Sequence, residues 1–115
     1  MAVVSEGGAV QTAVIGTEHI LLDIAESGVF VFEVNTKNMA AGDVLELRIS
    51  LIMLTGETRD VAYFYTYTGA QSIDDRVKIF PPVSNDLTDT GSVRCTLKQT
   101  LGTGRNYSWK VLKHV

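Results

Sequence analysis

Hydrophobic and polar residues alternate along most of this chain, and a period of two residues is typical of a β-strand with one buried face. The clearest case is DVLELRISLIML, residues 43–54. Its apolar positions are Leu45, Leu47, Ile49, Leu51 and Met53, and its polar positions are Glu46, Arg48 and Ser50. The next segment, TRDVAYFYTYT (58–68), is rich in β-branched and aromatic residues, so we predict a hairpin that turns around Gly56.

Shorter runs of the same kind predict the remaining strands. They cover residues 9–15, 18–24, 28–34 and 76–80, and a closing hairpin over 93–111 turns at Gly102, Thr103 and Gly104. Pro81 and Pro82 end the strand before them because proline has no backbone N–H to donate. By its composition, the segment 83–91 is predicted to be a surface loop.

About eight short strands and no helical segment predict an all-β protein. We expect a single-domain β-sandwich of about eight antiparallel strands, jelly-roll-like, over residues 9–115. A smaller immunoglobulin-like sandwich is the alternative, although the cysteine and tryptophan spacing of that family is missing. Gly7 and Gly8 loosen the chain before the first strand, so we expect residues 1–8 to form a flexible N-terminal arm.

The composition bounds the class of protein. A chain of 115 residues with 45% hydrophobic and 20% charged residues suits one globular domain. Cys95 is the single cysteine, which excludes an intrachain disulfide and a cysteine-clustered zinc site. The start of the chain lacks the features of a signal peptide, and no apolar run is long enough for a membrane span. We therefore expect a soluble chain without a membrane partner.

The charges are unevenly distributed. The net charge of −3 disfavours non-specific binding to nucleic acid, and we expect no nucleic-acid partner. Residues 1–75 hold eleven acidic and three basic residues, whereas residues 76–115 hold two acidic and seven basic residues. Opposite charges on neighbouring strands of one sheet would account for this distribution. The alternative is an acidic face and a basic face that meet between copies in an assembly.

Residues suited to catalysis or metal binding are sparse. His19 begins a predicted strand and His114 is the penultimate residue, and neither has the spacing of a metal site or a catalytic triad. Cys95 alternates with Val93 and Leu97, which favours a small core residue over a nucleophile. We therefore expect no enzyme activity, no catalytic residue, no metal and no cofactor.

Two loops match ligand-binding motifs only in part. Asn85, Asp86 and Asp89 in SNDLTDTG (84–91) could supply oxygen ligands to calcium, but the spacing of an EF-hand is missing, which favours a solvated loop. GTGRNY (102–107) has two glycines of a dinucleotide-binding motif, yet it joins two strands where that motif joins a strand to a helix. Its glycines are those of a turn.

A row of aromatic residues is the main candidate for binding. Tyr63, Tyr65 and Tyr67 share one face of their predicted strand. On an open sheet such a row can stack on sugar rings or form a protein interface. The alternative is that the rings pack in the core or at its rim. Trp109, by contrast, alternates with neighbouring apolar residues, which favours a core position.

The closing hairpin carries several cations. Arg94 and Lys98 share one face of a predicted strand and point away from Cys95 and Leu97. They either contact a partner or meet the acidic strands of their own sheet.

The order AAGDVLELRI, VAYFYTY and TLKQTLGTGRNYSWKVL resembles small structural proteins from the head-gene neighbourhood of tailed bacteriophages. Some of these proteins coat the outside of the capsid as decoration or cement proteins. The resemblance covers roughly residues 20–112 and leaves out the loop 83–89. It implies a non-enzymatic, β-rich virion structural protein that binds an assembled shell, often as an oligomer, and the family has no catalytic residues to transfer.

The resemblance implies that the chain binds and stabilises the outside of a phage capsid, with the major capsid protein as partner and a homo-oligomer as the assembly. The implied location is the capsid surface of the virion, after synthesis in the cytoplasm of the host bacterium. The alternative is a phage tail or surface adhesion module that binds carbohydrate through the tyrosines and the loop 83–91. We expect residues 1–8 to order on a neighbouring subunit. The candidate partner-interface residues are Tyr63, Tyr65, Tyr67, Arg94 and Lys98.

Overall fold

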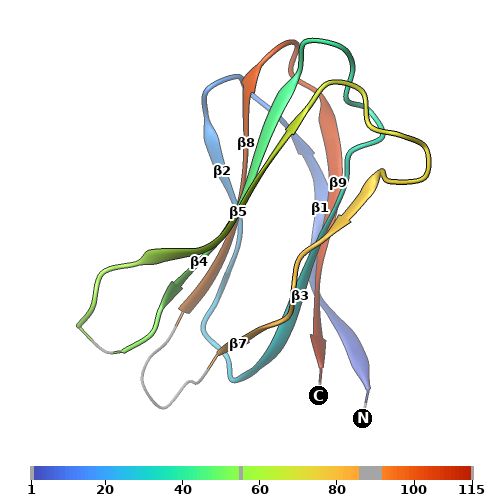
Figure 1. Cartoon of the computed structure of the whole chain (residues 1–115). Helices are drawn as coiled ribbons and strands as arrows, with labels where there is room; N and C mark the ends of the chain where they lie inside the picture. The colour runs from blue at the N-terminus through green and yellow to red at the C-terminus, as the bar shows by residue number, and fades with distance from the viewer. Residues whose placement is uncertain (1, 55, 86–91, 115) are drawn as a thin grey trace.

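The protein consists of two antiparallel β-sheets packed against each other (Figure 1). A computed structural model describes residues 2–54, 56–85 and 92–114. The first sheet contains, in order, β1 (Val3–Thr12), β9 (Asn106–His114), β3 (Gly28–Asn35) and β6 (Val77–Ile79), and β7 (Val83–Asn85) also pairs with β3. The second sheet contains, in order, β2 (Glu18–Ile24), β8 (Ser92–Leu101), β4 (Val44–Ile52) and β5 (Asp60–Thr68).

The predicted all-β sandwich is confirmed by these two sheets. Consecutive strands lie in opposite sheets except for the pairs β4–β5 and β6–β7, and the first strand pairs with the last. Such crossing between layers is typical of a jelly roll, and the jelly-roll-like connectivity stays our interpretation of it. In the part of the chain that the structure describes, no helix has the length and apolar character needed to span a membrane.

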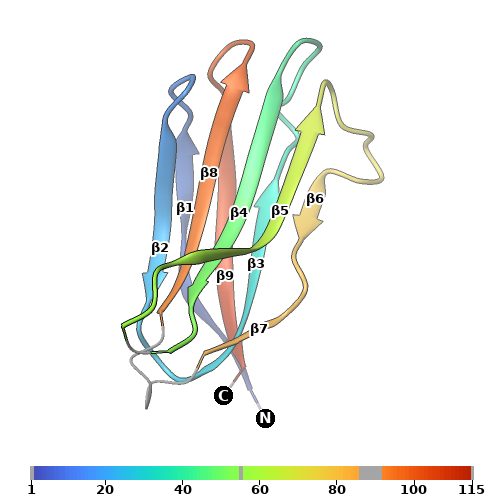
Figure 2. The same ribbon diagram turned by 60° about the vertical axis from the view of Figure 1, so that its left-hand side comes forward.

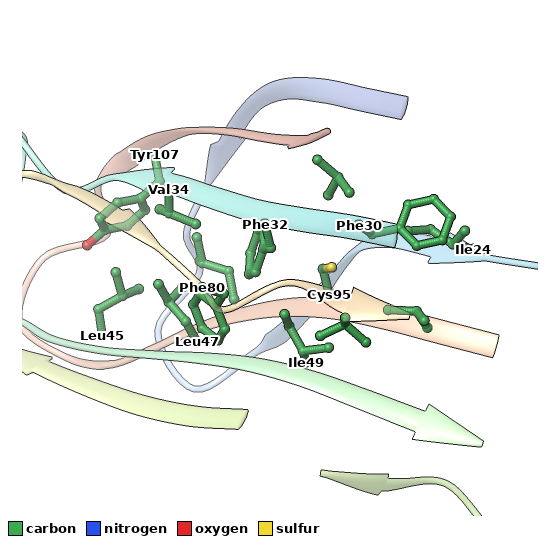
Figure 3. Close-up of a cluster of buried hydrophobic side chains, with 14 of the residues drawn as sticks. Ile24, Phe30, Phe32, Val34, Leu45, Leu47, Ile49, Phe80, Cys95 and Tyr107 are labelled. Carbon is green, nitrogen blue, oxygen red and sulfur yellow. The ribbon is translucent and has the colours of Figure 1, made fainter. Parts of the chain in front are cut away.

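Apolar side chains from alternate strand positions fill the space between the sheets (Figure 3). Leu45, Leu47 and Ile49 are buried, as the alternating pattern predicts. Met53 belongs to the same predicted face but is 73% exposed, because β4 ends at Ile52. The rest of the core comprises Ala13, Ile24, Phe30, Phe32, Val34, Met39, Phe80, Val83, Val93, Cys95, Leu97, Tyr107 and Val111.

The predicted flexible arm over residues 1–8 is wrong for residues 3–8, which belong to β1 and pair with β9. The two glycines that suggested a loose segment instead permit close packing. A Cβ atom on Gly8 would lie 3.1 Å from the Trp109 carbonyl oxygen, and one on Gly7 would lie 3.3 Å from the Leu22 side chain. Glycine in a strand often marks such a close approach. The sheet therefore begins well before residue 9.

Strand β7 also differs from the sequence prediction, which assigned residues 83–91 to a loop. Residues 83–85 pair with β3, as β6 does, so the prolines interrupt an edge of the first sheet but do not end it. The Asn85 side-chain amide donates to the Glu26 carbonyl oxygen over 2.8 Å. The predicted loop residues Asp86 and Asp89 lie outside the described residues.

A polar cluster fixes one end of the sandwich. The Asp43 carboxylate is buried and accepts hydrogen bonds from Arg105 Nε at 2.8 Å and from the backbone N–H groups of Ala40 at 2.9 Å and Thr103 at 3.2 Å. Gly102 has a φ of +92°, and a Cβ atom there would overlap Asp43. This carboxylate therefore ties the loop before β4 to the turn between β8 and β9.

The hydrogen bonds to Asp43 also set the direction in which its pKa is shifted. Burial by itself raises the pKa of Asp43, but the hydrogen bonds from Arg105, Ala40 and Thr103 outweigh it and hold the pKa below the ordinary value for aspartate. The buried Gln99 completes the cluster, because its Oε1 accepts from the Tyr107 hydroxyl at 2.9 Å and its amide donates to the Thr103 carbonyl at 2.7 Å.

Candidate interaction surface

Histidine, cysteine and carboxylate side chains are dispersed in this fold. No group of three or more of them is arranged to hold a metal ion among the described residues. His19, the second residue of β2, contacts the turn between β1 and β2: its Nε2 accepts from the Val14 N–H at 3.1 Å, and its Nδ1 lies 3.2 Å from Gln11 Nε2. Both ring nitrogens are therefore occupied by local contacts that fix this turn.

Cys95 is buried in the core, as its alternation with apolar residues predicts. Burial raises the pKa of its thiol to about 12, and the negative charge of Asp23 adds to this shift. The thiolate is the reactive form of cysteine, so this thiol is protonated and sheltered at neutral pH.

We expect Cys95 in the native protein to react with a disulfide reagent such as DTNB at pH 8 at least about 100-fold more slowly than in guanidinium chloride. Reaction can proceed only after the core opens, because the sulfur is both buried and protonated. The measurement is the rate of thiol release in each solvent. A native rate similar to the denatured rate would contradict the burial of Cys95.

The three tyrosines face the other sheet, at the rim of the core. In the register of β5 with β4 they lie opposite the buried residues Leu45, Leu47 and Ile49, so they share the inner face of the second sheet. The ring of Tyr65 meets Phe80 edge-on with a centroid separation of 5.0 Å, and Tyr63 meets it at 6.5 Å. The rings thus help to close the gap between β5 and the segment that follows β6.

Arg94 and Lys98 lie on the opposite, outer face of the same sheet. Arg94 forms a 2.9 Å ion pair with Asp23 of β2, and Lys98 lies between Glu18 of β2 and Glu46 of β4 in the strand register. Opposite charges on neighbouring strands therefore face one another here, which was one of the two alternatives. The five candidate interface residues do not form one continuous surface, since the tyrosines point inward.

A different surface, the outer face of the first sheet, exposes several apolar side chains. Phe30, Phe32 and Val34 of β3 point into the core, so the intervening residues point outward from the first sheet. Following the register across the sheet gives its neighbours on β1, β9 and β6. We call this surface the first-sheet face; its apolar members are Val3, Val10, Val29, Val31, Val77, Ile79 and Leu112.

Strand β6 contributes two exposed apolar side chains to this face and buries the lysine between them, which is the reverse of the usual arrangement. Val77 and Ile79 are 50% and 62% exposed, while Lys78 between them is only 6% exposed. The Lys78 ammonium group lies 3.0 Å from the Asp75 carboxylate and 4.6 Å from the centre of the Tyr67 ring, which accounts for its inward position. An alternating sequence shows that two faces differ but not which of them is buried, so the sequence alone could not reveal this inversion.

A shallow groove of about 360 Å³ crosses the first-sheet face. Its lining includes Glu33, Val77, Ser108 and Lys110. Glu33 is paired with Lys110 across β3 and β9, and Glu33 Oε2 is buried without a hydrogen-bond partner among the described residues. The groove thus places the exposed aliphatic side chain of Val77 beside the charged residues Glu33 and Lys110.

Comparison with protein-family models, with curated proteins and with solved structures finds no match. Exposed apolar patches with a polar component are typical of surfaces that bind other proteins. The first-sheet face has this character.

Proposed function

We propose that this chain is a non-enzymatic structural protein of a tailed-phage virion that binds the outside of the assembled capsid as a decoration or cement protein. The major capsid protein is the proposed partner, and the capsid surface is the proposed location after synthesis in the host cytoplasm. The sequence resemblance supports the class of protein. The first-sheet face supports its mode of action, because it offers a broad strand-borne surface for another protein.

The exposed aliphatic side chains on the first-sheet face are the observation that carries this proposal. Val77 and Ile79 project from β6 beside the groove that contains Glu33 and Lys110. Covering such side chains stabilises a complex by about 25 cal/mol for each Å² of apolar surface removed from water. A capsid presents many identical sites, so a modest contact of this kind, repeated in an oligomer, gives strong overall attachment.

The tyrosines give less support to the alternative, a carbohydrate-binding tail or adhesion module. Stacking on a sugar needs an open ring face. Tyr63 and Tyr65 instead pack against Phe80, and Tyr67 lies under the Lys78 ammonium group. These contacts favour a structural role for the row over stacking on a sugar.

Co-sedimentation with expanded capsids of the phage that encodes the chain tests the proposal. We expect the wild-type protein to bind saturably, at a fixed ratio to the major capsid protein. Ile79→Lys should weaken binding at least about tenfold, because a charge would be buried in the contact. Ile20→Lys is the matched control: Ile20 is a comparably exposed strand isoleucine, but it lies on the outer face of the second sheet, opposite Thr96.

Each result has a distinct meaning. Binding that is lost in Ile79→Lys and kept in Ile20→Lys supports the first-sheet face. Equal binding by both variants would show that this face is not the contact. If the folded wild-type protein fails to sediment with capsids, the decoration role is wrong, and a glycan array would then test the adhesion alternative.

A further inference from the structure

Strand β5 is an edge of the second sheet that differs from the other sheet edges. It pairs with β4 on one side, and no strand of the described residues pairs with its other side (Figure 2). An edge strand presents unpaired backbone N–H and C=O groups that can pair with another chain. Natural proteins usually disrupt such edges with bulges, charges, prolines or very short strands.

The other edges of the two sheets have one or more of these disrupting features. Strand β1 has an irregularity between Ser5 and Gly7 together with the charged Glu6 and two glycines, and β2 has one between Ile20 and Leu22 in addition to two acidic residues. Strands β6 and β7 have three residues each and are separated by two prolines. These three edges are therefore poor templates for another strand.

Strand β5 has few of these protections. From Val61 to Thr68 it contains no charged residue, no proline and no glycine. Its register with β4 shifts once, at Ala62, and is regular from Tyr63 to Tyr67. Phe64 on its outer face is 47% exposed, and Tyr65 on its inner face is 39% exposed. A regular, uncharged, aromatic strand of this kind favours pairing with a further strand.

We infer that β5 pairs with β5 of a second copy. The second sheet of each copy then becomes half of one continuous antiparallel sheet. Two identical strands related by a two-fold axis are self-complementary. Side chains opposite each other must lie on the same face of the sheet. This condition requires the two-fold axis to pass through a residue, and centring it on Tyr65, the middle of the regular stretch, pairs that whole stretch and places Phe64 of one copy opposite Thr66 of the other.

The distribution of charge favours a second copy as the occupant. In this register Asp60, the first residue of β5, and Arg59 just before it lie beside the segment 69–73 of the other copy, which has no charged residue. No pair of like charges is therefore brought together. The β5 edge and the first-sheet face belong to different sheets, so a dimer formed in this way leaves the proposed capsid contact uncovered.

Sedimentation equilibrium of the free full-length protein tests this inference without a capsid. We expect a dimer, and we expect Thr66→Lys to raise its dissociation constant at least tenfold. The new lysine would lie beside Phe64 of the other copy, over which the Arg48 guanidinium already stacks at 4.1 Å. In the monomer the same lysine faces Glu46 across β4, so the fold should be retained. Ile79→Lys is the control and should remain dimeric.

Several outcomes would overturn the inference. A wild-type protein that is still monomeric at about 100 µM, a concentration at which even weak dimers form, would overturn it. So would a Thr66→Lys protein that dimerises as the wild type does, or an Ile79→Lys protein that becomes monomeric. If Thr66→Lys does not fold, Tyr65→Cys replaces it: under oxidation the centred register predicts a covalent dimer through residue 65, and an uncrosslinked chain would contradict it. Buried Cys95 should not interfere.

Discussion

Replacing Asp43 with alanine is expected to lower the free energy of unfolding by about 3 kcal/mol, because buried hydrogen-bonding groups lose their acceptor. The backbone N–H groups of Ala40 and Thr103 and the guanidinium of Arg105 all donate to this carboxylate. For a domain of this size we expect the melting temperature to fall by about 10 °C. Thermal and urea unfolding of the two proteins measure the difference.

The pH dependence of stability provides a second test of Asp43. Its pKa is lower in the folded than in the unfolded chain, so its contribution is complete at neutral pH and is lost as the pH falls below about 4. The stability difference between wild type and Asp43→Ala should therefore shrink on acidification. Asp43→Asn keeps the shape and one oxygen acceptor, so it should be less destabilising than alanine at pH 7. A constant difference from pH 7 to pH 3 would contradict the role of the charge.

Replacing Phe80 with alanine is expected to lower the free energy of unfolding by about 3–5 kcal/mol, the range for removal of a buried phenylalanine. Phe80 is almost fully buried, and its ring centroid lies 5.1 Å from that of Phe32 and 5.0 Å from that of Tyr65. It therefore joins the two sheets at the open edge beside β5. Urea unfolding measures the loss, and near-UV circular dichroism should show a weaker tyrosine signal.

Phe80→Leu is the matched control for this prediction. It retains most of the apolar contact without the ring, and we expect a loss of less than about 2 kcal/mol. If Phe80→Ala were destabilising by less than about 1 kcal/mol, the tyrosine row would not depend on this ring. The packing alternative for the row would then lose its support, and the binding alternative that the sequence also left open would regain it.

The sequence was most informative where one strand face is buried. The predicted strand 18–24 matches β2, and the apolar positions 45, 47 and 49 of β4 are buried, because alternation reports a half-buried strand directly. Residues 3–8 were misassigned because glycine occurs both in loose termini and at close approaches within a sheet, and only the position of Trp109 and Leu22 decides between them. Local pattern cannot supply such contacts between distant segments.

The candidate surface was harder to predict for a related reason. Alternation grouped the tyrosines correctly on one face, but it could not show that this face turns toward Phe80. It likewise could not show that β6 exposes Val77 and Ile79 and buries Lys78. Both outcomes depend on which sheet lies behind the strand. Arg94 was assigned to a face correctly, and the acidic partner that it meets, Asp23, comes from a strand far away in the sequence.

Lysine labelling of the free and capsid-bound protein tests the central proposal most directly. Lys110 lies in the groove of the first-sheet face, and Lys98 lies on the outer face of the second sheet. After brief acetylation, mass spectrometry measures the modified fraction at each lysine. We expect binding to the capsid to protect Lys110 strongly and to leave Lys98 unchanged. Protection of Lys98 with unchanged labelling of Lys110 would contradict attachment through the first-sheet face.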